Sequence, residues 1–368
     1  MKVNILFLIV QMISMVNYDK LIIYYFSGTG NARRAAEWII DVAKEKGIET
    51  ELINIEKFKD YNSYEYENKT LIGFCFPTHG FNTPPIVVNF LRKFPKNLCS
   101  DIFLLNTRAG MKLYKIFTPG LSGIAQIVPA IILKLKGYKI IGFRPLDLPS
   151  NWISIHPGLR KKVVDSIFER CEKITRKFAD KIFRRKKIYR GLYSLPIDIA
   201  ISPISFAYYF FVRFMIAKTF VATDSCNNCG LCVKNCPLNA ISIIKDRPYW
   251  SFNCESCMRC MNNCPQRAIE TAHSYVVLLW WIAFSFVPYF VLKLIIENNI
   301  LQISYNTLES KILVNILMIV FGFAIIYLGY KILHFLMKFK FFNKLIAYTS
   351  LTKYKFWRRY KAPLSKNV

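Results

Sequence analysis

The chain has 368 residues, of which 53% are hydrophobic and 15% aromatic, and its mean hydropathy is positive at +0.25. This length predicts two or three domains, and this apolarity predicts that part of the chain lies in a bilayer. The formal net charge of +28 raises nucleic acid as a partner. Many basic residues flank apolar segments, however, where anionic lipid is the nearer counterion, and the sequence has no nucleic-acid-binding motif. We therefore expect membrane lipid, and no nucleic acid, as a partner.

Residues 1–18 begin with an apolar run behind Lys2, which resembles the hydrophobic region of a signal peptide. No small-residue cleavage site follows, the run is too short to span a bilayer, and a strand pattern begins almost at once. We interpret the run either as a peripheral apolar extension or as a stretch upstream of a translation start at Met12 or Met15.

The first strong pattern is a strand followed by a turn and a helix. Lys20–Phe26 is a continuous apolar run, as in a strand covered on both faces, and a helical pattern extends to about Lys46. The turn between them places backbone N–H groups and a helix N-terminus where a phosphate binds. It is neither a dinucleotide fingerprint nor a Walker loop. It resembles the flavodoxin phosphate loop, with Ala32 in place of the final threonine. The candidate phosphate-binding residues are Ser27, Gly28, Thr29, Gly30, Asn31 and Ala32.

Strand and helix patterns then alternate to about residue 143. Such alternation predicts a parallel sheet with helices on both faces. With five strands we expect an α/β, flavodoxin-like domain over residues 19–157, with strand order 2-1-3-4-5 and its ligand at the carboxyl ends of the strands. The later strands are expected at Glu51–Ile55, Leu71–Phe76, Ile102–Asn106 and Tyr138–Phe143, and the helices at Pro84–Phe94 and Leu113–Lys136.

Two loops follow the third and fourth expected strands, and in flavodoxins these positions hold the isoalloxazine ring. Phe81 is the candidate to stack on the ring, and the Gly80 and Gly110 backbones can approach it. The alternatives are a solvated His79 and a Phe81 tucked under its loop. Together the phosphate loop and the sheet pattern predict FMN. The candidate ring-binding residues are Pro77, Thr78, His79, Gly80 and Phe81 in one loop, and Thr107, Arg108, Ala109 and Gly110 in the other.

Residues 158–223 form a helical, basic connector. Its first part, to Tyr189, has the charge pattern of a solvated helix. The second part, Ile199–Ala222, has no acidic residue and an apolar background, so it is either an interfacial helix or a helix that docks the two modules. Pro203 and two basic residues argue against a membrane span, and we favour docking.

Cys226 to Ile269 contains two copies of the pattern C-x2-C-x2-C-x3-C-P, twenty-eight residues apart. This is the bacterial run that holds two [4Fe–4S] clusters, with the fourth cysteine of each copy ligating the other copy's cluster. A zinc site usually has two separated pairs instead, and a disulfide framework is the other alternative. The first predicted cluster is held by Cys226, Cys229, Cys232 and Cys264, and the second by Cys254, Cys257, Cys260 and Cys236.

The repeat resembles two-cluster bacterial ferredoxins, and we call residues 224–273 the ferredoxin module. A flavodoxin-like domain followed by such a module resembles the EFR-type ferredoxin family of anaerobic bacteria and archaea, over about Lys20 to His273. The resemblance implies FMN, two clusters and electron transfer, without a particular substrate. Because cluster thiols must stay reduced, we expect a reducing compartment.

Residues 274–336 contain two apolar stretches, Tyr275–Ile296 and Ile312–Leu333, each with a single charge and each long enough to cross about 30 Å of hydrocarbon. They predict a transmembrane hairpin. The tail, residues 337–368, carries nine Lys and Arg and no acidic residue. Positive charge stays on the cytoplasmic side, so we expect a multi-pass protein of the cytoplasmic membrane with its redox modules inside the cell.

The favoured function is a membrane-anchored carrier that passes electrons between FMN and the clusters, with a soluble donor and a membrane acceptor as partners. One alternative is an FMN-dependent reductase of a quinone or small organic substrate, and another is a non-catalytic redox sensor. No hydrolytic or transfer motif is present, and we assign no catalytic residue. Lys234, Arg259 and Arg267 flank the ligands, where positive charge raises a cluster's potential.

Overall fold

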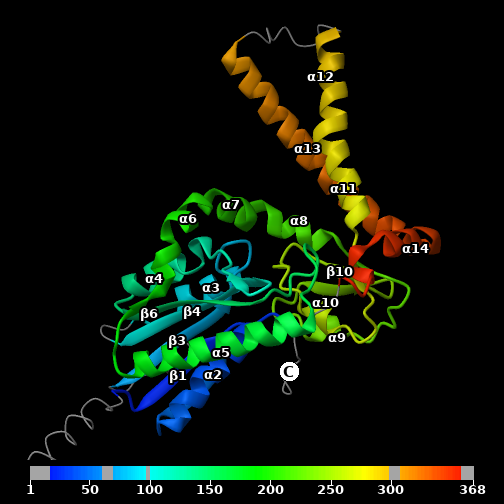
Figure 1. Cartoon of the computed structure of the whole chain (residues 1–368). Coiled ribbons are helices and arrows are strands. Elements are labelled where there is room, and N and C mark those ends of the chain that lie inside the picture. Colours follow the sequence, from blue (N-terminus) through cyan, green and yellow to red (C-terminus); the bar gives the residue numbers. More distant parts are fainter. Residues whose placement is uncertain (1–16, 60–68, 97–99, 298–306, 358–368) are drawn as a thin grey trace, which may run out of the picture.

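The computed structural model describes residues 17–59, 69–96, 100–297 and 307–357. The proposed N-terminal extension therefore lies outside the described residues, except for its last two. An α/β domain, a small cysteine-rich module and a long helical hairpin follow one another along the chain (Figure 1). The α/β domain and the cysteine-rich module lie side by side, and the hairpin rises from the module (Figure 1).

The α/β domain is built on a sheet whose main strands are parallel and follow the order β2-β1-β3-β4-β6. This order confirms the predicted flavodoxin-like topology. Two short strands were not predicted: β7 (Ile188–Tyr189) pairs with β6, and β5 (Ile116–Thr118) pairs antiparallel with β4, so the sheet has seven strands. The main strands are β1 (Lys20–Tyr25), β2 (Glu49–Asn54), β3 (Thr70–Pro77), β4 (Asp101–Leu113) and β6 (Lys139–Pro149).

Helices cover both faces of this sheet. On one face, α2 (Asn31–Glu45) and α5 (Lys161–Phe183) bury aliphatic side chains against β1, β3 and β4. On the other face, α3 (Pro85–Lys93) and α4 (Ile127–Leu135) do the same, around a cluster of aromatic rings that includes Tyr24. Both faces of the central strands are therefore dry, which explains their continuous apolar runs.

Two sequence predictions in this domain were wrong. The basic helix α5 is not merely a solvated connector, because its periodic apolar residues, such as Phe178 and Ile182, are buried in the sheet core. The helix expected at Leu113–Lys136 is confined to α4, since the residues before it complete β4, form β5 and make the short turn Gly123–Ala125.

The connector continues as a chain of short helices along one side of the molecule (Figure 1). Its polar side docks on the α/β domain, where the Asp198 carboxylate accepts from the backbone N–H of Gly123 at 2.7 Å and the Ser205 hydroxyl donates to the Phe81 carbonyl at 2.9 Å. Its other side is apolar and exposed. The helices are α6 (Leu195–Ala200), α7 (Ser202–Ala207), a π-helical turn (Tyr208–Val212) and α8 (Arg213–Lys218), and the exposed apolar residues include Ile197, Ile199, Ile204, Phe206, Phe210 and Phe211.

The ferredoxin module has the same backbone in both halves. Left-handed residues recur at an offset of twenty-eight: Asn228 and Ser256, Gly230 and Met258, Asn239 and Arg267. Each half has a short helix after its second cysteine and contributes to a two-stranded sheet. These elements are α9 (Leu231–Lys234), α10 (Arg259–Asn263), β8 (Phe220–Ala222) paired with β11 (Ile269–Thr271), and β9 (Ile241–Ile244) paired with β10 (Arg247–Trp250).

Among the described residues, two helices are long and apolar enough to cross a membrane: His273–Leu294 and α13 (Leu308–Leu336), with mean hydropathies of 2.0 and 2.6. The first contains α11 (His273–Trp281), a π-helical turn (Ile282–Phe286) and the start of α12 (Val287–Glu297). The connector pair Arg190–Ala200 and Ser202–Lys218 passes the same test only if its two parts, bent by 79°, count as one span. The two long helices pack closely at small residues: a Cβ on Gly329 of α13 would lie only 2.4 Å from Leu279 of α11. Tyr275 also donates a hydrogen bond to the Gly329 carbonyl at 2.7 Å.

After α13 the chain turns back onto the redox modules. Within α14 (Lys340–Thr349), the Asn343 side chain bonds the backbone of Asp224 and Ala222. Trp357 then reaches the α/β domain, where its indole donates to the Ile153 carbonyl at 2.6 Å. We call the segment from α14 to Trp357 the return segment. It contacts both redox modules, so both ends of the hairpin lie next to these modules. The last residues of the basic tail lie outside the described residues.

Candidate functional site

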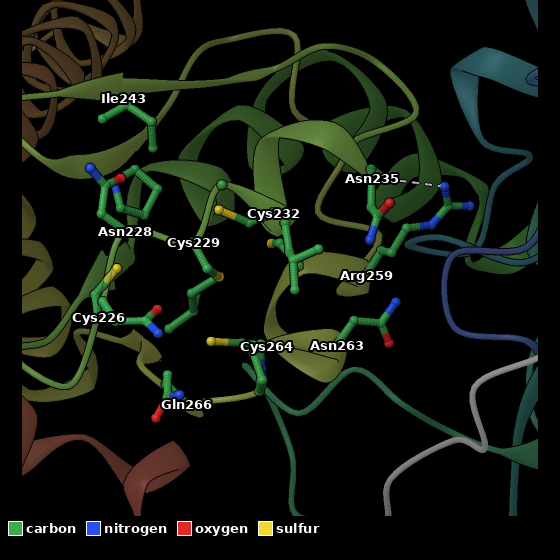
Figure 2. Close-up of a pocket in the computed structure, with 17 residues that line it drawn as sticks. Cys226, Asn228, Cys229, Cys232, Asn235, Ile243, Arg259, Asn263, Cys264 and Gln266 are labelled. Carbon is green, nitrogen blue, oxygen red and sulfur yellow. Dashed lines mark hydrogen bonds between the residues drawn. The ribbon is translucent and has the colours of Figure 1, made fainter.

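The first predicted cluster site is a small enclosed space at one side of the ferredoxin module. The sulfur atoms of Cys226, Cys229, Cys232 and Cys264 point toward it (Figure 2). Ile243, Pro248 and Ile269 close it with apolar surface. Three thiols from one loop and a fourth from the other half of the repeat thus meet, as the spacing predicts.

The second predicted site brings together the other four cysteines. Cys254, Cys236 and Cys260 share the apolar core of the module, and Cys257 lies where the module meets the phosphate loop at Gly28. Trp250 is fully buried, Cys260 packs against the apolar cluster that contains it, and the Trp250 indole N–H has no hydrogen-bond partner among the described residues.

Backbone hydrogen bonds to sulfur repeat in the two halves. The N–H of Ala240 donates to the Cys236 sulfur at 3.3 Å, and the N–H of Ala268 donates to the Cys264 sulfur at 3.3 Å. The Ser256 N–H donates similarly to Cys254 at 3.4 Å. Such bonds stabilise negative charge on the sulfurs and so raise the potential of a cluster that they hold.

The phosphate-loop residues lie between β1 and α2, as predicted. Gly30 adopts a left-handed conformation with φ of 100°, and its N–H bonds the Ser27 hydroxyl at 3.0 Å, which tightens the turn. The segment after β6 braces the loop: Asn151 donates to the Thr29 hydroxyl at 2.6 Å, and Asn31 donates to the Pro149 carbonyl at 2.7 Å. This leaves a helix N-terminus, free of acidic residues in its first turn, at the end of the loop.

A cavity of about 310 Å³ lies at the carboxyl ends of β1, β3, β4 and β6. It joins the phosphate loop to both predicted ring-binding segments and to the segment after β6, as expected for a ligand at the switch point of the sheet. Its lining includes Ser27, Gly28, Thr29, Asn31, Ala32, Pro77, Thr78, His79, Gly80, Phe81, Thr107, Arg108 and Ala109.

The geometry of the second ring-binding segment differs from the prediction. Thr107–Gly110 is not a loop, because β4 continues to Leu113 and pairs with β6 as far as Pro149. Arg108 forms a salt bridge with Asp147 at 2.6 Å across these two strands. Gly110 lies outside the cavity lining and packs on Asp147, where a Cβ would meet the backbone carbonyl at 2.3 Å.

In the first ring-binding segment, Gly80 has a φ of 53° and packs under the Tyr208 ring of the connector, where a Cβ would meet ring carbons at 2.0 Å. Phe81 also has a left-handed backbone, and its carbonyl accepts from Ile124 and Ser205. The loop is therefore fixed by the connector. His79 is buried beside the cavity, and burial lowers the pKa of its imidazole to about 4.

Trp152 is the aromatic residue that the sequence analysis did not select. Its ring lies in the cavity wall, stacks on His79 with centroids 6.4 Å apart, and meets Tyr208 edge to face at 5.5 Å. Its indole N–H donates to the Ser256 carbonyl in the ferredoxin module at 3.0 Å. The sequence feature that could have indicated this role is a tryptophan between two prolines just after the last main strand.

The phosphate loop touches the second cluster loop directly. A Cβ on Gly28 would lie 2.5 Å from the Cys257 carbonyl oxygen, so only glycine permits this approach. Cys257 and Met258 line the cavity. Arg259 is buried at the same junction, donates to the carbonyls of Ser27 and Gly28, and pairs with Glu56. Arg259 is thus a buried link, whereas Lys234 and Arg267 are exposed.

Family comparisons agree with this division. The flavodoxin family matches residues 23–112, and the 4Fe-4S dicluster domain matches residues 225–269. The chain joins a flavodoxin domain to a 4Fe-4S dicluster domain. Its cofactors are accordingly FMN and two [4Fe–4S] clusters, and the chain is an FMN and iron–sulfur electron-transfer protein. FMN exchanges one or two electrons and each cluster exchanges one, so the cofactors carry the chemistry that the protein positions.

Among solved structures, the chain is similar to a Megasphaera elsdenii flavodoxin, with 19% identity, a TM-score of 0.28, and coverage of 42% of this chain and 98% of the other. It is also similar to flavodoxin 1 from Bacillus cereus, with 18% identity, a TM-score of 0.30, and coverage of 43% and 96%. The rubredoxin oxygen:oxidoreductase of Desulfovibrio gigas has 14% identity, a TM-score of 0.28, and coverage of 48% and 39%. No curated protein matches the chain.

Proposed function

We propose that this protein is a membrane-anchored electron carrier in which electrons pass along the chain between FMN and the two clusters. The contact between Gly28 in the phosphate loop and Cys257 in the second cluster loop supports this order most directly. The flavin and the second cluster then share one wall. Cys260 belongs to the second predicted set and also lines the space of the first, so the two clusters are neighbours in turn.

The flavin cavity favours a carrier over an FMN-dependent reductase. Its volume of about 310 Å³ is at the low end of the range of roughly 300–1,000 Å³ for ligand pockets, and FMN itself must occupy it. Trp152 and the second cluster loop, at Cys257 and Met258, form part of its lining. In this proposal the flavin therefore exchanges electrons with the ferredoxin module.

Three features support anchoring in the cytoplasmic membrane with the redox modules inside the cell. Two helices are long enough to span, and both ends of the hairpin lie on the side of the redox modules. The connector helices α6 to α8 carry exposed apolar side chains and lie on the side of the molecule from which the hairpin rises (Figure 1). The tail after the second span is rich in Lys and Arg, as cytoplasmic segments are.

The partners in this proposal are a soluble redox protein and a membrane acceptor, together with anionic lipid. The soluble partner meets the first cluster, because Cys229 is exposed at the protein surface. Nucleic acid has no role in it.

The test is anaerobic purification of the full chain, followed by flavin and iron counts and flash photoreduction of the flavin. We expect one FMN and about eight irons per chain, and a cluster EPR signal that grows as flavin absorbance recovers. Clusters that stay oxidised while the flavin is reduced would contradict the relay. Removal of the tail by protease added to intact cells would contradict the orientation.

A further inference from the structure

A second cavity, of about 240 Å³, lies where the ferredoxin module meets the membrane hairpin. It is separate from the flavin cavity and shares no lining residue with it. Its walls come from the connector up to α8, from β10 and the residues after it, and from the end of α13 nearest the redox modules.

The lining of this cavity consists mostly of aromatic rings. Phe252 stacks parallel to Tyr327 with centroids 6.4 Å apart, and Phe211 stacks on Phe323 at 6.2 Å. The π-helical turn at Tyr208–Val212 presents Phe210 and Phe211 to this cavity, whereas the Tyr208 ring packs on Gly80 and Trp152 of the flavodoxin domain. Flat apolar walls of this kind fit a planar ring better than a flexible chain.

A few polar groups converge at the inner end of the cavity. The ammonium of Lys218, whose residue is only 5% exposed, donates to the Tyr249 hydroxyl at 3.2 Å and to the Trp250 carbonyl. The imidazole of His334 lies edge to face on Tyr249 with centroids 4.9 Å apart. An ammonium has three N–H donors, and two of them have acceptors among the described residues. A buried cation beside a hydroxyl and an imidazole fits a ligand that presents carbonyl oxygen.

The cavity lies between a candidate membrane span and the ferredoxin module. Phe323 and Tyr327 belong to the apolar helix α13, so in the anchored orientation proposed above a lipid-soluble molecule would enter from the bilayer. On the inner side, Lys218 donates to the Trp250 carbonyl, and Cys260 of the second predicted cluster packs against the buried apolar cluster that contains Trp250. Pro248, next to Tyr249, lines the first cluster site.

We propose that this cavity binds the headgroup of a membrane quinone and that the quinone exchanges electrons there with the neighbouring cluster. The inference deepens the proposed function, on which it rests, by giving the membrane acceptor a class and a place. The ring packs between the aromatic walls, one carbonyl accepts from Lys218 and the Tyr249 hydroxyl, and the isoprenoid tail extends along α13.

The overall reaction balances with the cofactors of this chain. With FMN and the clusters bound, reduced FMN would release two electrons and two protons, and the quinone would take up two electrons and two protons as both carbonyl groups become hydroxyl groups. The clusters would carry the electrons singly, and the protons would exchange with solvent. Lys218 and His334 line the cavity and could pass a proton to a bound carbonyl oxygen.

The test uses the full chain with its cofactors in nanodiscs. A photoactivatable naphthoquinone with a two-unit isoprenoid tail is cross-linked and the labelled peptides are mapped. Separately, the protein is reduced with dithionite and mixed with the same quinone without the photoactive group, and cluster reoxidation is followed. Tyr249→Phe removes one hydroxyl and Phe252→Trp fills the cavity, and their matched controls are Tyr289→Phe and Phe290→Trp on the exposed side of α12.

We expect labels on α13 and on the segment around Tyr249, and reoxidation about tenfold slower in both cavity variants, as for a lost hydrogen bond, with no change in the controls. Transfer from photoreduced FMN to the clusters stays at the wild-type rate in all four. Labels at Trp152 would overturn the inference in favour of the flavin cavity. If an isoprenoid hydrocarbon without a ring blocks the labelling as well as the quinone without the photoactive group does, the cavity is a lipid-chain site and the inference is overturned. Loss of FMN-to-cluster transfer in the wild type would refute the relay, while the labelled position still reports the binding site.

Discussion

Arg259 and Glu56 form a doubly hydrogen-bonded ion pair across the junction of the two redox modules, with side chains 10% and 11% exposed. The same guanidinium donates to the Ser27 carbonyl in the phosphate loop and to the Asn235 carbonyl in the other half of the repeat. One side chain therefore ties the flavin loop to both halves of the cluster module. A rigid, planar donor set is needed for this, which a lysine cannot supply.

Arg259→Met should loosen this junction. Removing one member of a buried ion pair leaves the other uncompensated and costs about 3–5 kcal/mol of stability. We also expect electron transfer from photoreduced FMN to the clusters to slow about tenfold or more, because the groups are no longer held in register. Flash photolysis measures the rate, and urea unfolding measures the stability.

Two matched variants distinguish the role of Arg259 in positioning the two modules from the effect of leaving Glu56 without a countercharge. Arg259→Met combined with Glu56→Leu removes both charges, so most of the stability should return while the transfer rate stays low. Lys173→Met breaks the exposed pair with Glu169 and should cost less than about 1 kcal/mol. A wild-type transfer rate in Arg259→Met would show that the pair does not set the spacing.

Gly28→Ala should separate the flavin loop from the cluster loop. Its Cβ would lie 2.5 Å from the Cys257 carbonyl, a contact with backbone that no rotamer relieves. We expect slower FMN-to-cluster transfer and a full complement of about eight irons, since the cysteines are untouched. Ser27→Ala is the control: it removes a hydroxyl from the same loop without adding bulk, and should weaken FMN binding but leave the transfer rate of FMN-loaded protein unchanged.

Replacing the fourth cysteine of either half of the repeat should remove one cluster. The cluster lost should be the one held by the three closely spaced cysteines of the other half. Cys236→Ser is expected to leave about four irons per chain and to abolish the cluster next to FMN, so photoreduced flavin no longer reduces the protein rapidly. Cys264→Ser should also leave about four irons but preserve that first transfer. Cys75→Ala and Cys171→Ser, at buried positions in the flavodoxin domain, should keep about eight. Equal loss of flavin reoxidation in both ligand variants would contradict the crossed assignment.

His79 should make the flavodoxin domain less stable in mild acid. Burial lowers its folded-state pKa to about 4, below the ordinary value near 6.5. The unfolded chain therefore binds a proton first as pH falls, and stability that is full above about pH 6.5 declines toward pH 4. Between pH 7.5 and 5.5 the loss from this one group is about 1 kcal/mol. The measurement is urea unfolding followed by the fluorescence of released FMN, with His79→Phe as the comparison, because phenylalanine retains the stacking on Trp152. An identical pH dependence in the variant would exclude His79 as the source.

The order of the main strands could be predicted from the sequence because the strands and their helices depend on local signals, and the crossed assignment of the cysteines rests on an equally local pattern and stays a prediction. Apolar runs at regular spacing specify strands and their covering helices, and the cysteine pattern specifies a ligand loop. The burial of helix α5 was not predicted because charged residues dominate its sequence. Its buried residues, such as Phe178 and Ile182, recur at helical spacing, and the sheet that they pack against is formed by distant segments of the chain.

The junction residues could not be predicted, for a different reason. Trp152, Arg259 and Glu56 lie in separate parts of the sequence, and their roles depend on how two independently folded modules dock. A buried ion pair also contradicts the ordinary expectation that arginine beside a loop is exposed. The extension of β4 through Arg108 was missed because its polar residues pair with Asp147 rather than pack apolar surface.

The return segment gives the chain an order of assembly during synthesis. Both candidate spans precede it in the chain, so the ribosome has made the whole hairpin before Asn343, Thr352 and Trp357 are available to bond the ferredoxin module and Ile153 of the α/β domain. These contacts therefore form only after both helices of the hairpin exist. A chain that stalls before that point has its hairpin but lacks this second attachment to the two redox modules.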